Sequence, residues 1–188
     1  MVVDVIIPVY RPEREKLTKL IDWLNKQTVK PSHVFFMQTL VEKKEDAEVL
    51  QMLQKAENAK VVPIEKKDFD HGGTRNKGAA LSKADYMLFM TQDAVPVDAY
   101  LIENLVQAME KEEAATAYGR QLPDDTVGVI EHYTREFNYP AKSYVKSKKD
   151  LETMGIKRIS AQMSAQCTVK MYMKKWAALC FILFSMKI

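Results

Sequence analysis

Apolar residues alternate between two kinds of spacing through the first two thirds of the chain. Nearly continuous apolar runs, typical of buried strands, lie at Val2–Val9, Val34–Met37, Lys60–Ile64, Tyr86–Thr91 and Ala114–Tyr118. Between them, apolar residues three or four positions apart predict amphipathic helices at Glu13–Gln27, Glu45–Ala56, about Gly73–Ser82, and from a cap at Asp98 through Met109. Strands that alternate with helices predict an α/β fold with an open, mostly parallel sheet flanked by helices.

Polar residues follow four of the predicted strands directly. Tyr10 and Gln38 come after the first and second apolar runs, residues 65–71 after the third, and Asp93 after the fourth. Ligands of open parallel sheets bind beyond the carboxyl ends of the strands. The pattern therefore predicts a ligand site at that edge of the sheet.

The segment Phe69–Ala79 concentrates polar chemistry at the junction between this loop and the following helix. It holds an acid, an imidazole, two adjacent glycines, a guanidinium and an amide. We expect Gly72 and Gly73 to permit close backbone approach or a positive backbone torsion. A helix N-terminus favours a phosphate, and the carboxylate of Asp93 can hold a divalent cation, so these parts predict a nucleotide-phosphate site.

Composition narrows the class of protein. The 188 residues are 47% hydrophobic and 28% charged, with a net charge of +3, which indicates one globular domain with a sizeable core. The short basic run from Lys142 to Lys149 is interpreted as a solvated loop rather than a nucleic-acid contact. Two cysteines without disulfide or metal spacing, and an N-terminus without signal-peptide character, predict a cytoplasmic protein. The apolar run Trp176–Phe184 is too short to span a bilayer.

Five motifs in a fixed order resemble those of a known enzyme family. They are Val5–Pro12, Phe69–Ala79, Thr91–Pro96, Tyr118–Pro123 and Phe137–Pro140. Over about residues 2–157 the chain resembles the family 2 glycosyltransferases of the GT-A fold, and within them the bacterial rhamnosyltransferase-like branch. The resemblance implies transfer of a sugar, rhamnose in that branch, from a TDP-rhamnose-like donor to a polysaccharide or cell-surface glycan, with inversion and metal assistance. It also implies peripheral membrane association of a full-length enzyme.

The resemblance assigns roles to individual residues. The residues that match nucleotide-sugar-binding positions are Pro8, Tyr10, Arg11, Asp70, His71, Arg75, Asn76 and Gln92. Asp93 matches the acid that holds Mg²⁺ or Mn²⁺ in that family. Structural roles stay open as alternatives for four of these residues. Tyr10 could cover the sheet edge, and Arg75 could form an ion pair with Asp68 or Asp70. His71 could be a structural hydrogen-bonding group, and Asp93 could cap a helix or turn.

The chain also departs from the family pattern. Thr91-Gln92-Asp93 holds one acid where the family carries two or three, and Gln38 and Thr39 stand where many relatives carry acids that hold the base. The choice of base is therefore open. A nucleotidyltransferase, which we considered instead, needs a Gly-rich basic loop after the first strand, and the residues following Tyr10 do not supply one.

The resemblance stops near residue 157. The family's general base is an Asp in a Glu-Asp motif beyond a Gly-Gly-Phe turn, and residues 1–188 contain no such combination. Residues 159–188 can be re-read in a shifted frame that spells Gly-Gly-Phe and a terminal Glu-Asp. We therefore expect a nucleotide-sugar-binding domain at 1–157 and an out-of-frame tail at 158–188 that forms no regular element. The acceptor half would then be incomplete, self-association is expected, and an inactive nucleotide-binding remnant is the alternative to an active enzyme.

Overall fold

The computed structural model describes residues 1–122, 128–130, 133, 137, 143–146, 165–169 and 181–184. Within these residues the strands are β1 (Val3–Val9), β2 (His33–Thr39), β3 (Ala59–Ile64), β4 (Tyr86–Met90), β5 (Thr116–Gly119), β6 (Tyr144–Lys146), β7 (Ala165–Val169) and β8 (Phe181–Phe184). The helices are α1 (Arg14–Asn25), α2 (Lys43–Leu53), α3 (His71–Leu81) and α4 (Leu101–Lys111), with a short 3₁₀ turn at Lys66–Asp68. No helix in this part of the chain is long and apolar enough to cross a membrane.

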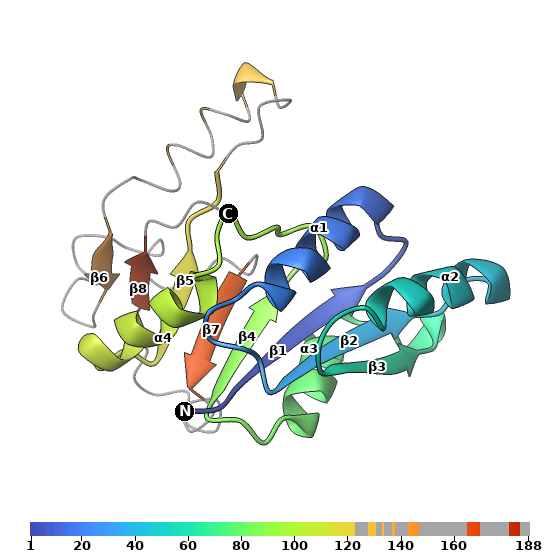
Figure 1. Cartoon of the computed structure of the whole chain (residues 1–188), viewed down its shortest axis with the longest axis horizontal. Helices are drawn as coiled ribbons and strands as arrows, with labels where there is room; N and C mark the ends of the chain where they lie inside the picture. The colour runs from blue at the N-terminus through green and yellow to red at the C-terminus, as the bar shows by residue number, and fades with distance from the viewer. Residues whose placement is uncertain are drawn as a thin grey trace.

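The strands form one sheet in the order β3-β2-β1-β4-β7-β5-β8-β6 (Figure 1). The first four strands of this order are parallel, and β7 is antiparallel to both β4 and β5. Register places Ile6 of β1 beside Phe35 of β2 and Phe89 of β4. The predicted α/β fold with a mostly parallel sheet is confirmed.

Helices cover both faces of the parallel strands. Alternate residues of β1, from Val3 to Val9, pack with α1, α2 and α4 on one face, whereas Ile6 packs with Met37 and the α3 residue Ala79 on the other. Burial on both faces explains why β1 is a nearly continuous apolar run rather than an alternating one.

Helix α3 lies very close to the sheet. A Cβ atom built on Gly78 would lie 2.6 Å from Cγ2 of Ile6 and 3.4 Å from Sδ of Met37. Only a residue without a side chain fits at this contact. The close packing fixes where the N-terminus of α3 lies relative to the ends of β1 and β2.

Two expectations about elements are wrong. Tyr100, not Asp98, precedes the first helical residue of α4, and the Asp98 carboxylate accepts from the backbone N–H of Tyr100 (2.9 Å) within the preceding turn. The chain after residue 157 does contain regular structure, because β7 lies between β4 and β5 in the sheet and β8 pairs with β5. Phe137 is helical; the rest of the Phe137–Pro140 motif lies outside the described residues.

Candidate functional site

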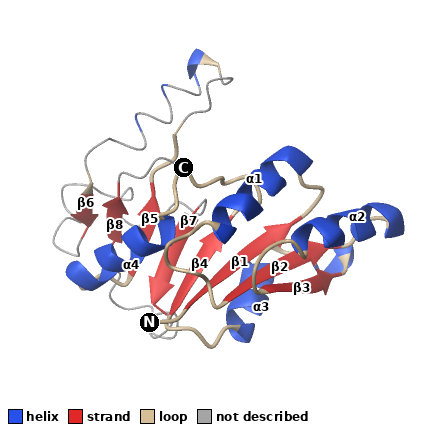
Figure 2. Cartoon of the chain, viewed as in Figure 1, coloured by secondary structure: helices blue, strands red, loops and turns tan. Residues whose placement is uncertain are grey.

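The carboxyl ends of β1 to β4 meet at one edge of the sheet because these four strands are parallel (Figure 2). Tyr10 follows β1, Thr39 ends β2, residues 65–70 follow β3, and Thr91–Asp93 follow β4. The structure therefore brings the segments predicted for the site to the same edge.

A double hydrogen bond joins the ends of β1 and β4. The backbone N–H of Tyr10 donates to Oε1 of Gln92 (2.8 Å), and Nε2 of Gln92 donates to the carbonyl of Tyr10 (3.0 Å). Gln92 thus holds the backbone of Tyr10 in place. This positioning role was not evident from the sequence, and the predicted contact of Gln92 with a ligand stays a prediction.

Aromatic rings line the gap between the end of β1 and the start of α3. The rings of Tyr10 and Phe69 stack with centroids 6.3 Å apart, and His71 meets Phe69 edge-on at 5.0 Å. The guanidinium of Arg11 lies 5.7 Å from the centroid of the Tyr10 ring, and Arg11 has a positive φ of 41°. A cation beside the exposed Tyr10 ring, which stacks on the half-buried Phe69, suits a planar, negatively charged ligand.

The N-terminus of α3 is capped by the predicted acid. The Asp70 carboxylate accepts from the backbone N–H of Gly73, and a Cβ on Gly73 would lie 2.8 Å from that carboxylate oxygen. Neither Gly72 nor Gly73 has a positive φ, so the close approach at Gly73 explains one glycine of the pair. The N–H of Thr74 donates to the Asp70 carbonyl (2.8 Å), so the backbone N–H groups of His71 and Gly72 are the two in this turn without a partner among the described residues.

Arg75 is half-buried one turn into α3. Its guanidinium donates to the carbonyl of His71 (2.8 Å), and its Nε has no hydrogen-bond partner in the described part of the chain. Within that part it makes no ion pair with Asp68 or Asp70. Burial lowers the pKa of Arg75, and the cation persists at neutral pH because the starting value is so high.

Neutral polar side chains lie at the end of β2. Nε2 of Gln38 donates to the carbonyl of Asp46 (2.9 Å), and the Asp46 carboxylate in turn accepts from the backbone N–H of Val41 (3.0 Å). Next to Gln38, the hydroxyl of Thr39 is buried without a partner among the described residues. A cavity of about 10 Å³ lies here, which has room for about one water molecule. It is lined by Val9, Arg11, Pro12, Gln38, Thr39, Val41, Glu45, Asp46 and Val49.

Asp93 is exposed in the turn after β4. The described residues contain no group of three or more His, Cys, Asp or Glu side chains that could hold a metal by themselves. A single carboxylate still fits Mg²⁺ or Mn²⁺, because such ions bind through one or two carboxylates plus phosphate oxygens and waters. Of the other predicted residues, Pro8 is half-buried near the end of β1 and Asn76 is exposed on α3.

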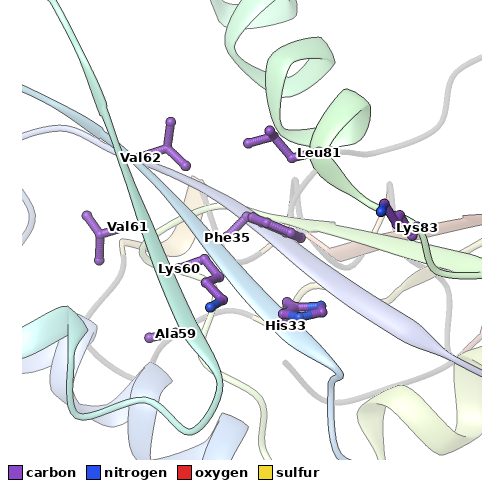
Figure 3. Close-up of a pocket in the computed structure, with 8 residues that line it drawn as sticks. All are labelled: His33, Phe35, Ala59, Lys60, Val61, Val62, Leu81 and Lys83. Carbon is purple, nitrogen blue, oxygen red and sulfur yellow. The ribbon is translucent and has the colours of Figure 1, made fainter.

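A larger cavity, of about 580 Å³, lies at the opposite edge of the sheet, at the amino ends of β2 and β3 (Figure 3). Phe35, Val62 and Leu81 line it together with two lysines, Lys60 and Lys83. It contains none of the residues predicted for the ligand site. Ligands of parallel sheets bind at the carboxyl ends of the strands. We therefore assign the candidate site to the carboxyl ends of β1 to β4, although the cavity at the amino ends is larger than the one there.

The mostly parallel sheet with helices on both faces is an α/β fold of the GT-A-like class, and the comparison with protein families agrees. The model of Glycosyl transferase family 2 matches residues 4–172, so the chain belongs to this family. The match extends past the boundary expected near residue 157.

Two curated relatives are rhamnosyltransferases. The chain is 34% identical over 160 residues to the O-antigen chain rhamnosyltransferase RfbN of Salmonella typhimurium, covering 85% of this chain and 49% of RfbN. It is 28% identical over 155 residues to the O-antigen chain rhamnosyltransferase WbaN of Salmonella anatum, covering 82% of this chain and 48% of WbaN. The chain spans about half the length of the curated relatives it matches.

Solved structures share the fold at low sequence identity. TarS of S. aureus (residues 1-349) has a TM-score of 0.72 at 14% identity, covering 98% of this chain and 58% of TarS. TarS has also been solved with UDP-GlcNAc, and that structure gives a TM-score of 0.71 at 16% identity, covering 98% of this chain and 56% of the other. The mannosyltransferase PcManGT from Pyrobaculum calidifontis, solved with GDP-Man and Mn²⁺, has a TM-score of 0.62 at 11% identity, covering 94% of this chain and 46% of PcManGT.

Proposed function

We propose that this chain binds a nucleoside diphosphate sugar, TDP-rhamnose or a close analogue, at the carboxyl edge of its sheet. As part of a glycosyltransferase it would transfer the sugar to an O-antigen-like polysaccharide. The observation that carries this proposal is that the segments holding Tyr10, Arg75 and Asp93 follow β1, β3 and β4, whose carboxyl ends lie at one edge of the sheet. The rhamnosyltransferase relatives support the sugar and the class of acceptor.

The residues divide the donor between them. The Tyr10 ring offers a stacking surface to a base, and Arg11 supplies a cation beside that ring. The first turn of α3 would present the backbone N–H groups of His71 and Gly72 to a diphosphate, and Asn76 would add an amide on the following turn. Asp93 would hold Mg²⁺ or Mn²⁺ beside that diphosphate. When bound, the cation supplies positive charge that stabilises the departing nucleoside diphosphate.

Transfer with inversion requires a general base that takes the proton of the acceptor hydroxyl. The family's Glu-Asp motif beyond a Gly-Gly-Phe turn does not occur in residues 1–188. This observation favours a second proposal, that the 188-residue chain binds donor without completing transfer. We also propose that residues from about 158 are out of frame, because residues 159–188 can be re-read in a shifted frame that spells that turn and motif.

Release of TDP from TDP-rhamnose, measured with Mn²⁺ and a rhamnose-acceptor glycan, separates the two proposals. We expect the 188-residue chain to bind TDP-rhamnose. We expect TDP to be released no faster in its presence than in the buffer control. Catalytic release by the 188-residue chain would contradict the second proposal and leave the first intact.

Sequencing the coding DNA tests the tail. We expect codons that spell the Gly-Gly-Phe turn and the terminal Glu-Asp in the shifted frame. Codons that do not spell them would refute the shifted frame, whatever the binding data show.

A further inference from the structure

The cavity at the amino ends of β2 and β3 lies on a part of the sheet that the body of α3 does not cover. Gly78 of α3 packs against Met37 of β2, and Phe35 lies two residues before Met37 on the same face. Helix α3 ends at Leu81, only three residues beyond Gly78, so it stops short of the sheet around Phe35. The cavity there has a volume of about 580 Å³, within the range of about 300–1,000 Å³ that is usual for small-molecule sites.

Apolar side chains make up much of the lining. Phe35 and Val62 come from the neighbouring strands β2 and β3, and Leu81 lines the cavity from the end of α3 (Figure 3). Leu81 is 48% exposed, although it is a large apolar residue. The ring of His33 lies 5.6 Å from that of Phe35, measured between centroids. These surfaces suit the apolar part of a ligand.

Two lysines from different elements give the same cavity a positive charge. Lys60 belongs to β3 and Lys83 follows α3, and Figure 3 shows them on either side of the Phe35 and His33 rings. Both lysines are exposed, and neither makes an ion pair with another residue that the structure describes. None of the described residues that line the cavity is acidic. The cavity therefore suits a negatively charged group beside an apolar one.

The nearby carboxylate of Asp4 is bound to other partners. Asp4 is buried in β1, where its Oδ1 lies 3.1 Å from Nδ1 of His33 and its Oδ2 accepts from the hydroxyl of Ser82 (2.7 Å). It is not among the residues that line the cavity. The Asp4 carboxylate is therefore directed at His33 and Ser82, while the two lysines supply the charge that meets a ligand.

Each lysine also has a structural explanation. A lysine on an edge strand such as β3 discourages pairing with another chain, and a lysine after a helix complements the helix dipole. Neither explanation requires Lys60 and Lys83 to line one cavity together with Phe35, Val62 and Leu81. This combination is what points to a ligand.

We propose that this cavity binds a small amphipathic anion, a single-chain molecule with an apolar tail and one carboxylate or phosphate group. Its tail would lie on Phe35, Val62 and Leu81, and its acidic group would bind Lys60 and Lys83. Because the cavity lies between the sheet and the end of α3, it takes a free molecule rather than the surface of a bilayer. The proposal is independent of the donor site, which lies at the carboxyl ends of the strands.

Calorimetry with decanoate, decanol and decyltrimethylammonium, each kept monomeric, tests the chemistry of the ligand. The three probes share an alkyl chain of similar length and differ in charge. We expect decanoate to bind the unmodified chain at least about tenfold more tightly than decanol, and the cation to bind most weakly. Equal affinity for decanoate and decanol would overturn the proposal, whether or not TDP binds. Displacement of decanoate by TDP would place the anion at the donor site and would overturn it as well.

A double variant, Lys60→Met with Lys83→Met, tests the position of the site. Methionine keeps much of the apolar stem and removes the charge, so decanoate should bind about tenfold more weakly while decanol binding stays the same. Lys43→Met with Lys44→Met is the matched control, because these exposed lysines belong to α2, which covers the opposite face of the sheet. Decanoate affinity should be unchanged in this control, and an equal loss in both double variants would overturn the assignment to the cavity.

Leu81→Gln tests the apolar lining. It should weaken decanoate and decanol alike, and it should leave the melting temperature unchanged because Leu81 is exposed. Unchanged affinity for both probes would contradict the placement of the tail. Binding of the unmodified chain to phosphatidylglycerol vesicles without binding of decanoate would also overturn the proposal, since the preference for anions would then belong to an open surface.

Discussion

Arg75 is a charged residue that the fold itself does little to stabilise. Its guanidinium is half-buried, has one unpaired nitrogen and makes no ion pair in the described part of the chain. Burial lowers the pKa of this side chain, which means that the folded state disfavours its charge. A charge retained under these conditions is better explained by a ligand than by stability.

Replacing Arg75 with methionine should therefore separate binding from stability. We expect Arg75→Met to weaken TDP binding about tenfold while the melting temperature stays the same or rises. Lys30→Met is the control, because Lys30 is exposed, pairs with Glu57 (3.1 Å) and precedes the amino end of β2, opposite the site. A drop in melting temperature without loss of TDP affinity would show that Arg75 is structural.

At the scale of elements, α3 is fixed at two points, by the Asp70 cap and by the contact of Gly78 with the sheet. The sequence predicted this helix and the concentration of polar residues at its start. It did not reveal the role of Gly78, because a helical glycine shows its packing partner, Ile6, only once the elements are placed. The bond between Gln92 and Tyr10 escaped prediction for the same reason: the two residues are far apart in sequence and meet only at the sheet edge.

Alanine at the two kinds of glycine should have opposite effects. Gly78→Ala should lower the free energy of unfolding by about 1–3 kcal/mol, because the new Cβ meets Ile6. Gly72→Ala should leave it unchanged or raise it by up to about 1 kcal/mol, since a new Cβ would lie 3.6 Å from Oδ2 of Asp70 and alanine favours helix. Urea unfolding of both variants measures this, and equal effects would contradict the close packing of α3.

The cap can be separated from a ligand contact at Asp70. Asp70→Ala should cost about 1 kcal/mol of stability, and Asp70→Ser should restore most of it because serine also caps helices. If Asp70 also contacts the donor, as the family resemblance implies, both Asp70→Ala and Asp70→Ser should bind TDP more weakly than the unmodified chain. Full recovery of both properties in Asp70→Ser would limit Asp70 to its capping role.

At the scale of the whole molecule, the order of strands and helices in the first 120 residues followed from hydrophobic periodicity, because each element there has a clear period. The position of β7 in the sheet could not be predicted in this way. Residues after 157 show no clear period, yet Ala165–Val169 fills the space between β4 and β5, where backbone pairing on both sides compensates for weak sequence preference. The shifted reading frame of these residues stays a prediction, and sequencing the coding DNA tests it.

The most direct test of the account is calorimetry of TDP binding to the 188-residue chain and to Asp93→Asn, each with and without Mn²⁺. Because Asp93 would hold the cation that meets the diphosphate, TDP should bind the unmodified chain tightly only with Mn²⁺, and Mn²⁺ should give no such gain in Asp93→Asn. Equal melting temperatures of the two proteins would confirm that this exposed substitution leaves the fold intact. The donor-site assignment would be contradicted by an absence of TDP binding under every condition, and the metal role of Asp93 by an undiminished Mn²⁺ effect in Asp93→Asn.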